Sequence, residues 1–179
     1  MPLINNNKIF MLAGESSGDL IGSSIMKGLK KNSKDLNFFG VGGSNMIKEG
    51  LLSVKGELYK GKRITFHDPC YLGRANNEYE APRAVLTKLE GELIEMKSCK
   101  AKGLCCGAGG AQMFKDAEAG NKEINIERTE QALETKPDII AAGCPFCNTM
   151  MTDGVKNKEK EGSIAVMDIA ELIQQAEDL

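Results

Sequence analysis

The sequence predicts an α/β protein with parallel sheets flanked by helices. Short apolar runs recur along the chain, and segments with a helical spacing of apolar residues separate them. After Leu51 the sequence changes to a polar stretch punctuated by glycine, which is typical of a linker or a hairpin. We therefore expect two parts: a short strand–helix–strand (βαβ) fragment in residues 1–54, and a second parallel sheet with its own helices in residues 55–179.

The first part contains two candidate strands and one candidate helix. Residues 8–13 (KIFMLA) and 37–43 (NFFGVGG) are apolar runs of the length of buried strands. The glycine-containing turn GESSGD ends the first run. Apolar residues with helical spacing follow it: Leu20, Ile21, Ile25 and Leu29. This order predicts a βαβ unit of the parallel kind.

The second part repeats the same alternation. We expect strands at residues 63–68, 92–96, 138–143 and 163–168, and helices at residues 80–90 and 121–135 and after Asp168. Asp168 can cap the last helix, with Glu171 three residues further on. The apolar stripe of that helix consists of Ile169, Leu172, Ile173, Ala176 and Leu179. A second parallel sheet covered by helices is the expected result.

Composition and charge exclude several classes of function. The chain has 23 Lys and Arg against 25 Asp and Glu and no long basic block, so no nucleic-acid partner is expected. The apolar run at residues 9–14 is too short for a membrane span or a secretory signal. We therefore expect a cytoplasmic protein. In that reducing compartment, six cysteines favour metal binding or catalysis over structural disulfides.

Five of the six cysteines follow predicted strands. Cys70 comes just after the strand at 63–68, and the adjacent pair Cys105 and Cys106 lies in the loop after 92–96. Cys144 and Cys147 follow the strand at 138–143. Because the carboxyl ends of parallel strands share one edge of a sheet, these thiols are expected to converge there.

Five convergent thiols favour an iron–sulfur cluster over a single zinc. A structural zinc site closes at four ligands, whereas a cluster has several irons that need thiolates. Glycines at 107, 109 and 110 would let backbone N–H groups approach cluster sulfides, and Pro145 would open a helix whose dipole favours thiolates. A structural zinc module remains the alternative.

Other roles for these residues are weaker. Cys144 and Cys147 also form a C-x-x-C redox pair, but dithiol chemistry there leaves the adjacent pair at 105 and 106 unexplained. The single histidine, His67, could either tune the site by a hydrogen bond or have a structural role. Cys99 lies outside the pattern and is expected not to be a ligand.

Three motifs in residues 55–179 resemble the cysteine-rich CCG domain of heterodisulfide reductases and related iron–sulfur oxidoreductases. They are HDPCYLGR at 67–74, CCGAGGAQMF at 105–114 and GCPFCNTMM at 143–151. The resemblance implies a non-cubane [4Fe–4S] cluster, or in some members zinc, and it implies redox partner subunits or an electron carrier. The ligands it implies are Cys70, Cys105, Cys106, Cys144 and Cys147. Family members commonly carry two such motifs, and this chain has one, so a disulfide cleavage that needs two clusters is not expected. The resemblance leaves two expectations: electron relay, or membership of a multi-subunit dehydrogenase similar to those that oxidise lactate or glycolate.

Residues 1–52 resemble a different family. AGESSGD at 13–19 and GVGGSNM at 40–46 are similar to the N-terminal end of lipid-A-disaccharide synthase, a glycosyltransferase built from two doubly wound domains. Residues 15–19 match the loop of that family, but the resemblance stops near residue 52, before most of the binding cleft. The first part is therefore expected to be a remnant without glycosyltransferase activity. We interpret the chain as a fusion with its join within residues 46–61, arising from recombination or from sequence assembly.

Overall fold

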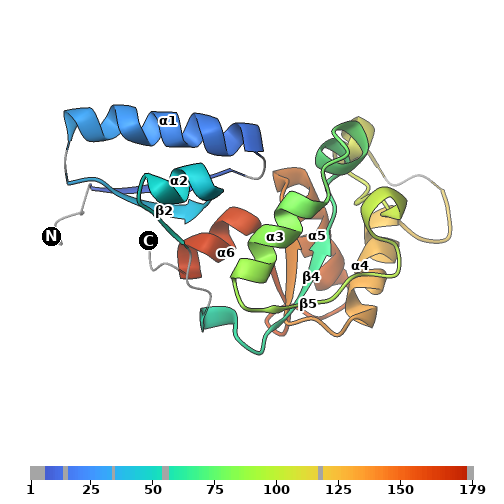
Figure 1. Cartoon of the computed structure of the whole chain (residues 1–179). Helices are drawn as coiled ribbons and strands as arrows, with labels where there is room; N and C mark the ends of the chain where they lie inside the picture. Colours follow the sequence, from blue (N-terminus) through green and yellow to red (C-terminus); the bar gives the residue numbers. More distant parts are fainter. Residues whose placement is uncertain (1–6, 14–15, 34, 54–56, 117–118, 177–179) are drawn as a thin grey trace, which may run out of the picture. The chain divides into compact units, whose positions relative to one another are not determined.

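The computed structural model describes residues 7–13, 16–33, 35–53, 57–116 and 119–176 (Figure 1). The chain divides into two compact units, Met1–Lys55 and Gly56–Leu179. Each unit contains its own parallel sheet. The prediction of an α/β protein with parallel sheets and flanking helices is therefore confirmed.

The first unit is a three-stranded parallel sheet in the order β1-β2-β3. Its elements are β1 (Lys8–Leu12), α1 (Ser16–Asn32), β2 (Asn37–Val41), α2 (Ser44–Lys48) and β3 (Leu51–Ser53). The βαβ prediction is confirmed, and β3 extends it. Leu51 pairs with Phe38 and is buried with it, so this residue belongs to the core and not to a polar linker.

Helix α1 turns a different face to the core from the one that its apolar spacing indicates. Leu20, Ile21 and Ile25 are exposed, whereas Met26 is fully buried. The inward face carries Gly22, where an added Cβ would lie 2.5 Å from the Met46 sulfur of α2. The missing side chain thus lets α2 pack closely against α1.

Asp19, in the first turn of α1, supports α2. Its Oδ1 accepts a hydrogen bond from the Met46 amide at 2.9 Å, and its Oδ2 accepts one from the Asn45 amide at 3.0 Å. These bonds satisfy backbone donors at the start of α2 that have no partner within the helix. Glu15 of the matching loop lies outside the described residues.

The second unit is a four-stranded parallel sheet in the order β5-β4-β6-β7. Its strands are β4 (Arg63–His67), β5 (Glu92–Leu93), β6 (Ile139–Ala142) and β7 (Ala165–Asp168). Its helices are α3 (Glu80–Lys88), α4 (Ile124–Glu134), α5 (Pro145–Asn157) and α6 (Ile169–Ala176). Short helical turns lie at Glu57–Tyr59, Tyr71–Ala75, Lys100–Lys102 and Gly109–Phe114.

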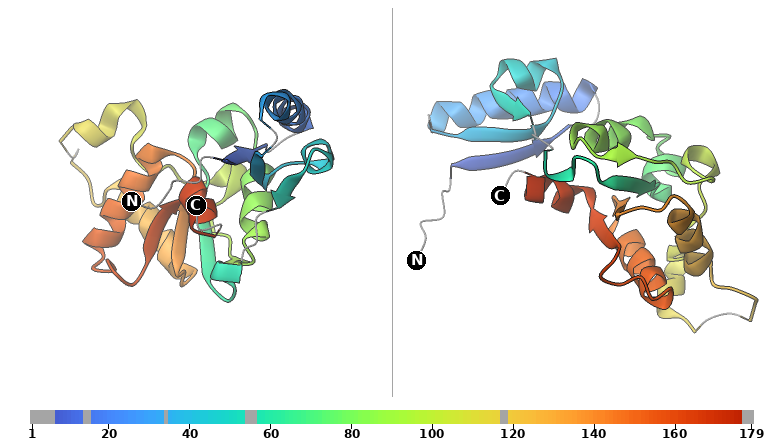
Figure 2. Two further views of the ribbon diagram at one scale, coloured as in Figure 1. Left: turned by 90° about the vertical axis from the view of Figure 1, so that its left-hand side faces the viewer. Right: turned by 90° about the horizontal axis from the view of Figure 1, so that it is seen from below.

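Helices cover both faces of this sheet. α3 packs with α6 on one face and α4 packs with α5 on the other (Figure 2). All four residues of β6 are buried, as expected for a central parallel strand. Side chains of Ile140, Met151 and Val155 share the core on the α4–α5 side. No helix in the described parts of the chain combines the length and apolarity that crossing a membrane requires.

Side-chain hydrogen bonds help to determine where β5 ends and where α6 begins. β5 is shorter than the expected strand at 92–96, because the Thr65 hydroxyl donates to the Ile94 carbonyl at 2.8 Å and Glu95 turns toward Arg83. α6 begins as expected: the Asp168 carboxylate accepts from the Ala170 amide, and Glu171 accepts from the Asp168 amide, both at 2.8 Å. In its apolar stripe Ile169, Leu172 and Ile173 are buried, and Leu179 lies outside the described residues.

Candidate metal centre

All five expected ligands lie in segments that follow strands of the second sheet. Cys70 precedes the helical turn at Tyr71–Ala75, just after β4. Cys105 and Cys106 lie between the turns at Lys100–Lys102 and Gly109–Phe114, in the connection that follows β5. Cys144 caps α5 directly after β6, and Cys147 lies in the first turn of that helix. The strands are parallel, so these segments leave the sheet at the same edge.

Three side chains form the compact part of the site. The sulfurs of Cys106 and Cys147 are 3.3 Å apart, and both residues are buried. The potential ligand atoms of His67, Cys106 and Cys147 all lie within 4.8 Å of one another. Cys144 is half-buried and packs against the Cys106–Cys147 pair. Sequence segments far apart along the chain therefore meet at one buried position.

The other cysteines lie outside this compact group. Cys105 is half-buried, and its sulfur accepts a hydrogen bond from the Gly107 amide at 3.3 Å. Cys70 is exposed. Cys99 is half-buried, and burial, with the nearby Glu95 carboxylate, raises the pKa of its thiol.

The glycine-rich turn after Cys106 has left-handed backbone at two glycines and at Ala111. Gly107 has φ +92° and Gly110 has φ +65°, both in the left-handed region. At Gly107 an added Cβ would also lie 3.5 Å from the Asn125 amide nitrogen of α4. The turn thereby carries the chain away from the adjacent cysteines while keeping its backbone close to α4.

The buried sulfur pair favours a single thiolate. The hydrogen bond from the Cys147 thiol lowers the pKa of Cys106; burial opposes this, and a hydrogen bond from His67 reinforces it. The same sulfur–sulfur contact, together with burial, raises the pKa of Cys147. The position of Cys147 in the first turn of α5 provides a helix dipole that stabilises negative charge. A soft metal would bind at this pair as the remaining proton leaves.

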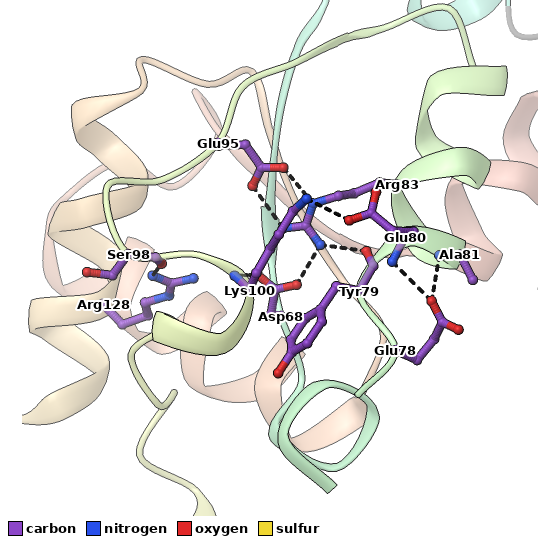
Figure 3. Close-up of polar contacts among 10 residues, drawn as sticks. All are labelled: Asp68, Glu78, Tyr79, Glu80, Ala81, Arg83, Glu95, Ser98, Lys100 and Arg128. Carbon is purple, nitrogen blue, oxygen red and sulfur yellow. Dashed lines mark hydrogen bonds and ion pairs between the residues drawn. The ribbon is translucent and has the colours of Figure 1, made fainter. Parts of the chain in front are cut away.

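A buried ion-pair network holds the loop that leads into the adjacent cysteines (Figure 3). Arg83 of α3 donates to Asp68 at 2.7 and 3.0 Å and to Glu95 at 2.9 Å. Asp68 also accepts the Lys100 amide at 2.7 Å. Asp68 lies between His67 and Cys70, so this network ties the end of β4 to the loop before Cys105.

Sequence reasoning missed the buried cation behind His67. Arg128 of α4 is fully buried, and its Nε donates to His67 Nδ1 at 2.9 Å. Its Nη1 donates to the Ser98 carbonyl at 2.7 Å and to Gln131 at 3.0 Å. Only the structure reveals this cation: α4 turns polar residues inward, whereas Ile124 at its start is 52% exposed. A helix with a polar inner face indicates a polar site beneath it.

The donor set fits a thiophilic metal. Thiolates and one imidazole make up the compact group, and no carboxylate among the described residues joins it. Sulfur and imidazole ligands select zinc, copper(I) or iron–sulfur clusters over harder cations. The site can therefore hold a soft metal ion or a cluster at the sheet edge.

Comparison with known proteins agrees with this geometry. Residues 64–152 match the family model of the CCG cysteine-rich domain, a segment that contains all five expected ligands. Residues 9–57 match the lipid-A-disaccharide synthetase family. The two matches do not overlap, and the division between the two compact units, after Lys55, lies two residues before the end of the synthetase match.

Similar proteins include several named for iron–sulfur chemistry. The chain is 45% identical over 134 residues to a probable iron-sulfur-binding oxidoreductase, FadF, of Bacillus subtilis, covering 74% of this chain and 19% of that protein. It is 42% identical over 139 residues to an EtfAB:quinone oxidoreductase of Syntrophomonas wolfei, with the same two shares. It is 38% identical over 128 residues to one component of the dihydromethanophenazine:CoB–CoM heterodisulfide reductase of Methanosarcina barkeri, covering 69% of this chain and 30% of that component.

These relatives are much longer than the matching part of this chain, which spans 19% to 30% of their lengths. The expected resemblance to heterodisulfide reductases and iron–sulfur oxidoreductases is confirmed. Residues 64–152, the cysteine-bearing segment of this chain, therefore match the CCG family of cysteine-rich domains, and the segment before it matches lipid-A-disaccharide synthetase.

Proposed function

We propose that this protein is an iron–sulfur redox module that relays electrons as a component of an oxidoreductase. The observation that carries the proposal is the buried group of His67, Cys106 and Cys147, with Cys144 packed against it. The segments that carry Cys70 and Cys105, the remaining candidate ligands, leave the sheet at the same edge. The names of the similar proteins, which include an iron-sulfur-binding oxidoreductase, support the same chemistry.

The proposed cofactor is a [4Fe–4S] cluster of the non-cubane type. Its ligands would be Cys70, Cys105, Cys106, Cys144 and Cys147. When bound, such a cluster supplies one-electron chemistry. The chain supplies a buried pair of thiols at Cys106 and Cys147, a helix N-terminus beneath Cys147, and a tight glycine turn that keeps the backbone close.

The electron donor and acceptor are proposed to be partner subunits or a soluble carrier. Among the similar proteins, one is named an EtfAB:quinone oxidoreductase and another is named as one component of a heterodisulfide reductase. We also propose a cytoplasmic location, because all six cysteines are free thiols.

Anaerobic reconstitution of the full chain with iron and sulfide tests the proposal. We expect a coloured protein that retains both iron and acid-labile sulfide after desalting and gives an EPR signal in one oxidation state. A colourless product without sulfide would contradict the proposal.

A structural zinc site is the second candidate, and the compact group itself favours it. On the same cysteines, Cys106, Cys147 and Cys144 would provide three thiolate ligands of a closed tetrahedral site, with Cys105 or Cys70 as the fourth. Elemental analysis of the same samples distinguishes the two. Zinc at about one equivalent per chain without sulfide is the expected composition of a structural site.

Two other functions have less support. For dithiol chemistry at the C-x-x-C pair, Cys147 would react with Cys144, but its sulfur contacts Cys106 at 3.3 Å. For glycosyl transfer, one acidic residue of the matching loop, Asp19, is engaged in capping α2. We propose neither of these functions.

A further inference from the structure

His67 has two possible roles at the metal centre. It is the last residue of β4, is 1% exposed, and is the single histidine of the sequence. Its distance to the two buried sulfurs would allow its imidazole to bind the metal directly. The groups that surround its two ring nitrogens decide between a ligand and a hydrogen-bond donor.

One ring nitrogen is occupied by a donor that cannot give up its proton. Arg128 Nε–H points to His67 Nδ1 at 2.9 Å, and an arginine stays protonated in proteins. Nδ1 must therefore accept, which leaves the ring proton of the neutral imidazole on Nε2. That leaves Nε2–H as the ring donor for an acceptor at the metal centre, where one imidazole nitrogen and the Cys106 and Cys147 sulfurs lie within 4.8 Å of one another. In this tautomer neither nitrogen has a lone pair available for a metal.

The positive charge of Arg128 is buried without a carboxylate partner. In the described parts of the chain, no acidic group lies within ion-pair distance of its guanidinium, and its Nη2 has no hydrogen-bond partner. The nearby Asp68 is already engaged by Arg83 and by the Lys100 amide. Burying an unpaired charge is costly, so an anion close to Arg128 would stabilise the folded chain.

The candidate ligands supply that anion. Arg128 contacts His67, whose imidazole lies within 4.8 Å of the Cys106 and Cys147 sulfurs, so its charge is close to these candidate ligands. A cluster with thiolate ligands carries net negative charge, and this charge grows by one when the cluster accepts an electron. A fixed cation and a hydrogen bond to a ligand sulfur therefore stabilise the reduced state more than the oxidised state.

Resting on the iron–sulfur function proposed above, we propose that His67 is a positioning residue and not an iron ligand. Its Nε2–H donates to the Cys106 sulfur, and Arg128 fixes the imidazole in this tautomer. Together the two residues raise the reduction potential of the cluster. During reduction one electron enters the cluster, and no bond to His67 forms or breaks.

Selective labelling tests the role of His67 without a substitution. Because the sequence has a single histidine, growth on ¹⁵N-histidine labels this ring alone. We expect the EPR-active cluster to show only the weak ¹⁵N hyperfine coupling of a hydrogen-bonded imidazole, and a coupled deuteron after exchange into D₂O. A strong coupling typical of a directly bound nitrogen would overturn the proposal.

Variants of the full chain test the effect on the potential. In Arg128→Met we expect the iron content to stay at the wild-type level. The equilibrium constant for one-electron reduction should fall at least tenfold, which is a shift of about 59 mV. His67→Leu should act in the same direction. His67→Gln should stay close to wild type, because its amide can both accept from Arg128 and donate to Cys106.

Lys97→Met is the matched control, since it removes one positive charge from an exposed ion pair with Glu134. The proposal is wrong if Arg128→Met shifts the potential no more than this control does. It is also wrong if His67→Leu loses iron to the same extent as Cys106→Ser. Wild-type protein that takes up no iron and sulfide would instead overturn the proposed function, and this inference with it.

Discussion

Each cysteine of the candidate site has a different environment, so substitutions should separate ligands from bystanders. We expect Cys105→Ser, Cys106→Ser and Cys147→Ser to lose most of the iron and sulfide that wild type retains, because a serine hydroxyl is a poor ligand for iron. Cys99→Ser should retain both. Iron and sulfide analysis after anaerobic reconstitution measures the outcome. Loss of the metal in Cys99→Ser would show that the ligand assignment is wrong.

Glu130 on α4 provides a pH-dependent contribution to stability. Its hydrogen bonds with Lys122 and Lys158, both at 2.5 Å, lower its pKa to about 2. A carboxyl group whose pKa is lower in the folded than in the unfolded chain stabilises the fold. This contribution is complete at pH values above the unfolded pKa, which is about 4.3. That contribution is lost as the pH falls toward 2.

We therefore expect Glu130→Gln to lower the free energy of unfolding at pH 7 and to have no effect near pH 2. The difference should be small and should shrink in high salt, because the ion pairs are partly exposed. Glu127→Gln is the control, because Glu127 forms an ion pair with only one of the two lysines, Lys122. Denaturant unfolding at several pH values provides the measurement. An effect of equal size at pH 2 and pH 7 would contradict the assignment.

The limits of sequence reasoning are also clear at the level of single residues. The cysteines were identifiable because thiols after successive parallel strands must meet at one sheet edge. Arg128 was not identifiable, because an arginine on a helix is usually a surface residue. Its burial depends on α4 turning a polar face inward, which becomes apparent only when the helix is placed against β4 and β6.

Most elements follow from their local patterns. β4, β6, β7 and the start of α5 at Pro145 lie where apolar runs and helix-start signals predicted them. β5 is shorter than expected and β3 was not expected. In both cases the deciding contacts come from distant residues: Thr65 and Arg83 end β5, and Phe38 pairs with β3. Such contacts cannot be read from periodicity within a short segment.

The start of α6 provides a prediction for a single helix. The Glu171 carboxylate accepts from the Asp168 amide, and the Asp168 carboxylate accepts from the Ala170 amide, an arrangement similar to a capping box. Asp168→Ala should lower the free energy of unfolding by about 1 kcal/mol, because the Ala170 amide loses its acceptor. Glu171→Gln should have a smaller effect, since glutamine can fill the same place in the box. Thermal or denaturant unfolding measures both, and equal losses in the two variants would argue against the capping role of Asp168.

For the whole molecule, the division into two units predicts that the second is sufficient for metal binding. All candidate ligands, Arg128 and the sheet that positions them lie within Gly56–Leu179. We expect a chain that starts at Gly56 to fold with the circular dichroism of an α/β protein and to bind as much iron and sulfide as the full chain. An unfolded product, or one that cannot be reconstituted, would show that the first unit contributes to the site.

The first unit has apolar side chains on both of its outer faces. Phe10, Leu12 and Leu52 are exposed on the side of the sheet away from the core, at 38%, 54% and 52%. Ile21 and Ile25 are exposed on the outer side of α1, at 61% and 48%. In a complete doubly wound domain, further helices and strands would cover such surfaces.

These uncovered faces have a consequence inside a cell. Chaperones and quality-control proteases recognise exposed apolar surface, and aggregation begins from it. The lifetime and abundance of this protein would then be set by the synthetase-like fragment, while the proposed redox chemistry belongs to the other unit. Loss of residues 1–55 would raise the amount of active protein per cell without changing the cluster itself.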